Sequence, residues 1–289
     1  MTHRSVKSIV HAHKVNMGGH LINRPLSMSN VDQDMNPFLL IDHLNEELQG
    51  GRRQHELGVG PHPHRGFSPV TLIFKGDIQH RDSLGNNTIV RAGGTQWLYA
   101  GKGIVHSERP SEDLAINGGE NELIQLWVNV PAQYKMDPPY YQPLSAQNTP
   151  KIRLEKASIS VVSGDYKGVT GPIKPHSPQM ILRVEAEAGA ELSIPSPQHF
   201  NTLIYLLDGE IETDHQYVQG LEMVLFNHDA QDLKISVRKK TRFIILSGEP
   251  IHEELVSNGP FVMNTQEEIL EAFRDAKSGK MGVLREVFH

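Results

Sequence analysis

Two short segments of the chain each carry a pair of metal-binding side chains two residues apart. The first segment, H-P-H, contains His62 and His64, and the second, H-S-E, contains His106 and Glu108. Successive side chains of a β-strand point to opposite faces, so residues two apart share a face. Two such strands facing each other across a barrel interior would gather three imidazoles and one carboxylate. The spacing therefore predicts a metal site held by β-strands.

Composition limits the chemistry of this site. The 289 residues include no cysteine, which excludes disulfides, thiolate ligands and a cysteine nucleophile. The formal net charge of −6 provides no basic surface for nucleic acid or an acidic membrane. No apolar run approaches the ~20 residues that span a bilayer, and the N-terminus leads into no apolar signal segment. We therefore expect a cytoplasmic protein whose metal is held by nitrogen and oxygen.

Short apolar segments recur along the chain between turns rich in glycine and proline. Residues 38–41, 70–74, 96–99 and 123–130 are predicted strands, and Ser83–Asn87 is a predicted hairpin turn. Asp42 and His43 are expected to end the first of these strands. No helical period separates the strands, so an all-β barrel or sandwich is predicted.

The chain also repeats itself. Residues 71–78 are echoed by 202–211, and the strand before Pro131 is echoed more faintly by the one before Pro250. This favours a duplicated barrel, with a linker at 138–141 that divides the chain into domains 1–137 and 138–289. In the second copy, the places of His62 and His64 fall near Ser193 and Pro195, so no metal site is expected there.

One helix is predicted near the C-terminus. Thr265 and Glu268 have the spacing of a capping box. Ile269, Leu270 and Phe273 form the expected apolar stripe, and Gly279 ends the helix. We expect this helix to pack on a barrel face and to carry no chemistry.

Neutral imidazoles and a carboxylate suit divalent first-row metals. A tetrahedral zinc ion would be saturated by four ligands and structural, whereas an octahedral ion would keep two positions open. We expect Fe(II) in an open site, although nickel, manganese, copper and zinc accept the same ligands. Glu108 has a second possible role, as a general base for a bound hydroxyl group.

Several further residues are candidates for the surroundings of the metal. Phe67, Trp97 and Val105 are expected to form an apolar wall. Arg65 either shapes the mouth of the site or pairs with a carboxylate, and Asp42 either orients a ligand histidine or caps a turn. Proline cannot donate to a β-ladder, so the H-P-H segment is expected at a sheet edge, a strand start or a bulge. Solvated or structural roles are expected for the remaining histidines considered: His11, His13, His20, His55, His80, His176 and His252.

These motifs, read together, resemble the pirin family of the cupin superfamily. The segments that carry the resemblance are 62–67, 96–108, 125–129, 247–250 and 259–269. The resemblance implies a bicupin of two antiparallel β-barrels, with metal in the N-terminal barrel only. The family ligands fall on His62, His64, His106 and Glu108. One departure is Ser68, which stands where most pirins have a glutamate.

The resemblance implies two kinds of function. Some pirins resemble quercetin 2,3-dioxygenases, which open the flavonol heterocycle with dioxygen and release carbon monoxide, and in that case Glu108 would take the proton of the 3-hydroxyl. Others are metal-dependent partners of transcription factors or metabolic enzymes. A third alternative is an enzyme for a different enol or phenol. We expect the flavonol dioxygenase, with a protein partner as the alternative and no direct contact with nucleic acid.

Overall fold

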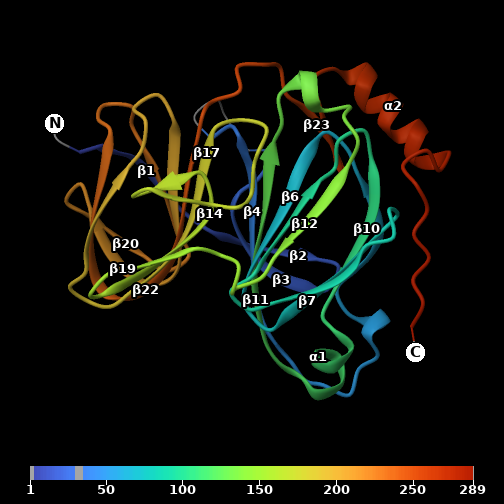
Figure 1. Ribbon diagram of the computed structural model, residues 1–289, viewed down its shortest axis with the longest axis horizontal. Coiled ribbons are helices and arrows are strands. Elements are labelled where there is room, and N and C mark those ends of the chain that lie inside the picture. The colour runs from blue at the N-terminus through green and yellow to red at the C-terminus, as the bar shows by residue number, and fades with distance from the viewer. Residues whose placement is uncertain (1–2, 30–34, 289) are drawn as a thin grey trace. The chain divides into compact units, whose positions relative to one another are not determined.

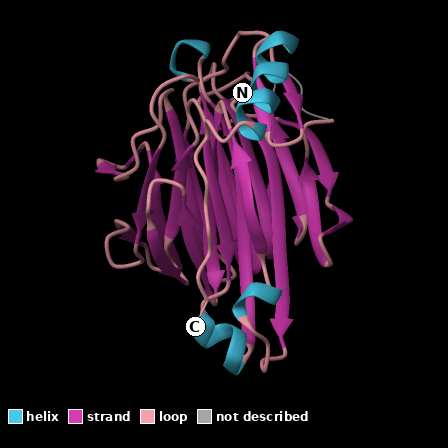
Figure 2. Cartoon of the chain, turned by 90° about the vertical axis from the view of Figure 1, so that its right-hand side faces the viewer, coloured by secondary structure: helices cyan, strands magenta, loops and turns pink. Residues whose placement is uncertain are grey.

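The computed structural model describes residues 3–29 and 35–288, and strands make up most of it (Figure 2). The chain divides into two compact units. The one that carries the candidate ligands, here called the histidine unit, comprises residues 16–22, 42–148 and 252–289. The other, here called the second unit, comprises residues 1–15, 23–41 and 149–251. Both are built from antiparallel strands, which confirms the predicted all-β fold.

The units are not the consecutive segments 1–137 and 138–289 expected from the sequence. Residues 252–289 belong to the histidine unit and residues 1–15 to the second unit. The predicted linker is also wrong, because Tyr140–Leu144 forms strand β12, which pairs with β9 (Thr95–Tyr99). Tyrosine favours strands, so the two tyrosines after the proline pair continue the sheet. The boundary falls instead between residues 148 and 149.

The histidine unit contains two sheets. One has the order β12-β9-β6-β11-β4-β3-β2, and the other has the order β5-β10-β7-β8. Figure 1 labels β2, β3, β4, β6, β11 and β12 of the first sheet and β7 and β10 of the second. Ile73 and Leu123 of the first sheet pack with Ile78 and Val90 of the second in one apolar cluster. The sheets therefore form two layers around a core, as in a jelly roll, and do not close into one continuous barrel. Along the chain, β2, β3 and β4 each continue from one unit into the other. The remaining strands of these sheets have the bounds β2 (His13–Met17), β3 (His20–Leu26), β4 (Phe38–Leu48), β5 (Val59–His64), β6 (Phe67–Lys75), β7 (Asp77–Asp82), β8 (Asn87–Arg91), β10 (Ile104–Arg109) and β11 (Gly119–Asn129).

The second unit is built on a nine-stranded sheet. Its main path is β1-β21-β19-β22-β17-β14-β13, while β18 pairs with β22 and β20 with β19. Its core is largely aliphatic, with Val161, Leu182, Ile204 and Ile245 completely buried. The strands of this unit are β1 (Val6–His11), β13 (Lys151–Arg153), β14 (Ala157–Ser163), β15 (Asp165–Tyr166), β16 (Val169–Thr170), β17 (Gln179–Ala186), β18 (Glu191–Pro195), β19 (Asn201–Thr213), β20 (Gln216–Gln219), β21 (Glu222–Phe226) and β22 (Asp232–Gly248).

The predicted C-terminal helix is confirmed as α2 (Gln266–Lys277). Thr265 and Glu268 form the expected capping box, each side chain accepting from the other's backbone N–H. The predicted apolar stripe is only partly right. Ile269 and Ala272 are buried, but Leu270 is 57% exposed, because it lies one residue off the face that packs on β23 (Val256–Asn258) and β24 (Phe261–Met263). No helix in the described part of the chain is long and apolar enough to cross a membrane. The other short helices are η1 (Gln54–Glu56), α1 (Glu112–Asn117) and η2 (Ala132–Tyr134).

Two local predictions bear on the site. The hairpin turn at 83–87 is confirmed, since β7 and β8 pair on either side of it. Asp42 and His43 do not end their strand, which continues to Leu48 with both side chains buried. His43 finds a partner in Glu122 of the neighbouring strand β11, with Nε2 and Oε1 3.4 Å apart. A buried polar side chain needs a hydrogen-bond partner, and this pairing supplies one for His43 inside the strand.

Candidate metal centre

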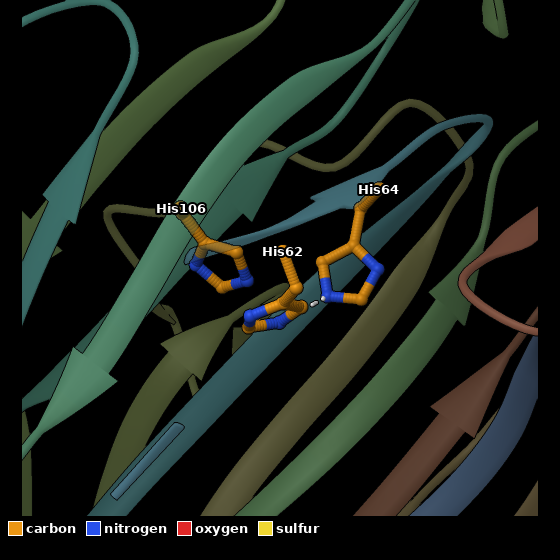
Figure 3. A group of neighbouring side chains, drawn as sticks. All are labelled: His62, His64 and His106. Atoms are coloured by element: carbon orange, nitrogen blue, oxygen red, sulfur yellow. Dashed lines mark hydrogen bonds between the residues drawn. The ribbon is translucent and has the colours of Figure 1, made fainter. Parts of the chain in front are cut away.

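Three histidines converge on one point of the histidine unit. His62 and His64 lie on β5, and His106 lies on the adjacent strand β10, directly opposite His62 in the register. One ring nitrogen from each residue lies within 4.8 Å of the others. Figure 3 shows the three rings turned towards one another. The convergence of these three side chains, expected from their spacing, is therefore present.

The H-P-H segment lies at a sheet edge, as its proline requires. β5 is the outermost strand of the four-stranded sheet, and its register with β10 shifts between His106 and Glu108. Gly66, which follows the segment, has φ of +86°, and an added Cβ would lie 2.0 Å from the Val262 carbonyl oxygen. Only glycine fits this close approach, so the turn that ends the ligand strand depends on Gly66.

The hydrogen bonds of His62 and His64 fix where their protons lie. His62 Nδ1 is 2.8 Å from the Gly60 carbonyl oxygen, and His64 Nδ1 is 3.2 Å from that of Pro260. A carbonyl oxygen only accepts, so both Nδ1 atoms carry hydrogen and both Nε2 atoms present lone pairs. Those two Nε2 atoms are 3.0 Å apart. Two lone pairs at this distance fit a shared cation.

His106 supplies the third nitrogen. Its Nε2 is buried and has no hydrogen-bond partner among the described residues. Burial, and then the charge of neighbouring histidines, holds the pKa of His64 and of His106 well below the usual 6.5. Both rings are therefore neutral, as metal ligands must be. The three imidazoles fit a divalent first-row metal.

The Glu108 carboxylate is not part of the group that the three histidines form. Its Oε1 accepts from Thr71 Oγ1 at 2.9 Å and from Gln96 Nε2 at 2.6 Å, and its Oε2 accepts from Gln125 Nε2 at 2.7 Å. Glu108 shares a strand face with His106, but these hydrogen bonds occupy both of its oxygens. Three neutral donors, which suit an ionised carboxylate, hold it beside the cluster.

A cavity of about 520 Å³ opens beside the histidines. His62, His64 and Glu108 line it, as does Asp42. The other walls are largely apolar, and alternate residues of β11 form one of them, as the strand period requires. The main lining side chains besides those named are Ile22, Leu44, Ile78, Asn121, Leu123, Gln125 and Trp127. This size and character suit a small, largely apolar ligand.

The aromatic wall differs from the prediction. Trp127 lines the cavity, whereas Trp97 is completely buried in β9 and does not. Phe67 lies behind the wall, with its ring centroid 4.3 Å from that of Trp127 and 5.1 Å from that of His64. Val105 packs into the cluster around Phe261 and also lies outside the cavity. The reason is strand register, which decides which face of each strand meets the cavity.

Arg65 and Ser68 also lie outside the cavity lining. Arg65 pairs with Asp275 of α2, with Nη2 and Oδ2 2.8 Å apart, and donates to the Lys102 carbonyl oxygen. Of its two predicted roles, pairing with a carboxylate is the one observed. Ser68 is buried in β6 opposite Val128. Asp42 lies within β4 and lines the cavity.

Sequence reasoning missed the polar residues that surround the ligands. His80, expected to be solvated or structural, is buried with its Nδ1 3.5 Å from His106 Nδ1. A signal was available, because His80 and Asp82 repeat the two-residue spacing of the ligand pairs. Gln96 and Gln125 were signalled only by being polar residues within strongly apolar strands.

An antiparallel jelly roll with a histidine cluster on adjacent strands defines a cupin. Comparison with known families places the chain further. The model described as Pirin matches residues 20–128, and the model described as Pirin C-terminal cupin domain matches residues 181–282. The chain belongs to the pirin family.

Named relatives and solved structures agree with this placement. The chain is 33% identical to Pirin of Homo sapiens over 270 residues, which cover 91% of this chain and 87% of that protein. It is 32% identical to a Pirin-like protein of Solanum lycopersicum over 271 residues, which cover 92% and 89%. Among structures, a quercetin 2,3-dioxygenase from Acinetobacter baumannii is 31% identical with a TM-score of 0.94, covering 98% of this chain and 100% of that one.

A more distant solved structure contains a metal of its own. Bacterial pirin YhhW from Escherichia coli, solved in complex with nickel(II), is 19% identical with a TM-score of 0.67. The alignment covers 84% of this chain and 99% of that one. At this identity the likeness concerns the fold alone.

Proposed function

We propose that this protein is a metal-dependent dioxygenase that opens the heterocyclic ring of flavonols such as quercetin and releases carbon monoxide. The observation that carries the proposal is the pair of Nε2 lone pairs 3.0 Å apart on the wall of a largely apolar cavity of about 520 Å³. The similarity to a structure titled quercetin 2,3-dioxygenase supports the choice of substrate.

The proposed ligands are His62, His64 and His106 through Nε2, with Glu108 as the fourth. Fe(II) is the proposed metal, and nickel, manganese, copper and zinc suit the same donors. A bound redox-active ion would supply the activation of dioxygen that this reaction needs. Movement of Glu108 towards the histidines requires its bonds to Gln96 and Gln125 to adjust, since they hold both oxygens away from the cluster.

The residues of the cavity have separate proposed tasks. Glu108 accepts the proton of the flavonol 3-hydroxyl. Its side chain lines the cavity, and its carboxylate oxygens act only as hydrogen-bond acceptors. Trp127 confines the flat ring system. Its Nε1–H has no partner among the described residues and is a donor for a substrate oxygen. Leu44 and Leu123 exclude water from the reacting face.

Aerobic incubation of the metal-loaded protein with quercetin tests the proposal. We expect the flavonol absorbance to fall and carbon monoxide to be released. His62→Ala, which removes one proposed ligand, is the control. Equal rates for wild type and His62→Ala would refute the proposal. A comparison of kcat/KM across ring-hydroxylated compounds then separates a flavonol enzyme from one for another enol or phenol.

A regulatory role is the second candidate, because the relatives include proteins named simply pirin or pirin-like. In that case the metal state would alter the binding of a protein partner. Retained partner binding in Glu108→Ala, together with no flavonol turnover by the wild type, would favour this role. Loss of partner binding only on metal removal would strengthen it further.

A further inference from the structure

The three ligand histidines are held in two different ways. His62 and His64 each direct Nδ1 at a backbone carbonyl oxygen. His106 instead directs Nδ1 at a side chain, with Nδ1 of His80 3.5 Å away. A ring nitrogen can donate or accept, so this contact alone does not decide which atom of His106 carries the proton.

Asp82 decides it. His80 Nε2 is 2.9 Å from Asp82 Oδ2, and both side chains are almost completely buried. An ionised carboxylate only accepts, so Nε2 of His80 carries the hydrogen and Nδ1 of His80 presents a lone pair. That lone pair accepts from Nδ1–H of His106. Nε2 of His106 is consequently the unprotonated nitrogen and faces the metal position.

Asp82 is itself fixed in orientation. Its Oδ1 accepts from the backbone N–H of Leu84 at 2.9 Å and of Asn86 at 3.1 Å. Its Oδ2 accepts from Asn86 Nδ2 at 2.7 Å as well as from His80. The hairpin turn between β7 and β8 therefore clamps the carboxylate, and the two oxygens cannot exchange places without breaking backbone bonds.

Tyr141 completes the arrangement. Its ring stacks on His80 with centroids 3.8 Å apart and an interplanar angle of 2°. Its hydroxyl donates to Gln96 Oε1 at 3.1 Å, and Gln96 in turn donates to Glu108. One tyrosine thus restrains both His80 beside His106 and the amide beside Glu108.

We propose that His80, Asp82 and Tyr141 are positioning residues that set the tautomer of His106 and strengthen its bond to the metal. The inference rests on the proposed function only in taking His106 as a metal ligand. Loss of such an outer partner typically lowers metal affinity about 10- to 100-fold. Flavonol turnover is not needed for the test.

Asp82→Asn is the decisive variant. Its remaining oxygen stays with the N–H groups of Leu84 and Asn86, so its amide NH₂ faces His80 and forces the opposite tautomer. Nδ1–H of His80 then faces His106, which must present Nδ1 as acceptor and carry hydrogen on Nε2. We expect the affinity for Ni(II), measured by titration calorimetry on metal-free protein, to fall about 10- to 100-fold.

Asp77→Asn is the matched control. Asp77 is a buried carboxylate on the same strand, but it binds the N–H and hydroxyl of Ser111 and no histidine. We expect its Ni(II) affinity to equal that of the wild type. Equal losses in Asp77→Asn and Asp82→Asn would overturn the proposal, since the effect would then be structural.

Nuclear magnetic resonance of the metal-free wild type shows directly which ring nitrogen of each histidine carries hydrogen. This measurement needs no metal and does not depend on whether a variant folds. We expect wild-type His106 to carry hydrogen on Nδ1 and His80 on Nε2. His106 with hydrogen on Nε2 would overturn the inference directly. A wild type that binds Ni(II) and shows the expected tautomers but turns over no flavonol would refute the dioxygenase and leave this inference standing.

Discussion

Thr71 and Thr202 begin the same T-L-I segment in the two units, yet they hold groups of opposite charge. Thr71 lies in β6 opposite Gln125 and donates to the Glu108 carboxylate. Thr202 lies in β19 opposite Ser247 and accepts from the guanidinium of Arg4 at 3.1 Å. The same strand pair therefore supports an anion in the histidine unit and a cation in the second unit.

In the second unit a buried cation, Arg4, lies beside Thr202. The side chain is almost completely buried and donates to the carbonyl oxygens of Phe200, Ala230 and Pro197. A fixed positive charge there repels a metal cation. Within residues 3–29 and 35–288, the histidine cluster of the histidine unit is the one group of potential ligands found. The strand scaffold alone therefore does not make the site.

Of the variants considered, His106→Ala should have the largest effect on metal affinity. It removes one of three converging nitrogens, so we expect metal affinity to fall more than about 100-fold, beyond the loss from an outer partner. Titration calorimetry with Ni(II) measures the change. Arg4→Met, in the second unit, should leave the affinity unchanged. Equal affinities for wild type and His106→Ala would place the metal elsewhere.

Arg4→Met should instead destabilise the protein by about 3 kcal/mol, because several buried carbonyl oxygens lose their donor. Urea denaturation followed by circular dichroism measures the loss. Arg238→Met is the matched control, because Arg238 is an exposed partner of Glu212. Exposed ion pairs contribute only about 0–1 kcal/mol. A change as small as that of the control would show that Arg4 is not the support of the second unit.

Buried Lys135 should make the free energy of unfolding depend on pH. Burial lowers the pKa of Lys135 to about 7, although Glu253 and Glu268 oppose the shift. Between that pH and the usual 10.5, the unfolded chain holds a proton that the folded chain has lost. Stability therefore rises with pH in this window, by up to about 1.4 kcal/mol per pH unit.

Urea denaturation of wild type and Lys135→Met at pH 7, 8 and 9 measures this slope. The difference in unfolding free energy should change with pH in favour of the wild type. The matching difference for Arg4→Met should stay constant, because a guanidinium remains charged throughout this range. A constant difference for Lys135→Met would contradict the prediction.

Thr71→Val and Thr202→Val should give the smallest and most direct contrast. Each removes one hydrogen bond of about 1 kcal/mol. In the histidine unit the loss should strengthen metal binding up to about fivefold, because Glu108 loses one of the donors that hold it beside the histidines. In the second unit it should lower only the free energy of unfolding. Calorimetry and denaturation of both variants test this, and the reverse assignment would undo the comparison.

Strand period alone predicts the convergence of the proposed ligand histidines, because residues two apart share a face. It could not place Trp97 and Trp127 correctly, since the register between strands decides which of them faces the cavity. Nor could it foresee that Pro260, far along the chain, supplies the carbonyl oxygen that orients His64. For the same reason, the sequence did not indicate that residues 1–15 belong to the second unit and residues 252–289 to the histidine unit. Such contacts arise from long-range packing and leave no local signal.

His80 is a different case, since its signal was local. It precedes Asp82 by two residues on a strand, as His62 precedes His64, and of the two roles expected for it, solvated or structural, the structure shows the structural one. Solitary histidines are often solvated, but a histidine followed by a carboxylate at that spacing can form a buried pair. The orientation of the His106 ring follows from the pair that His80 forms with Asp82.

An anomalous-scattering map of metal-loaded crystals tests whether His62, His64 and His106 hold the metal. We expect one metal ion per chain, about 2.1 Å from Nε2 of His62, His64 and His106, and no metal beside Arg4. A metal bound through Nδ1, a second ion in the other unit, or an ion away from these histidines would contradict the account.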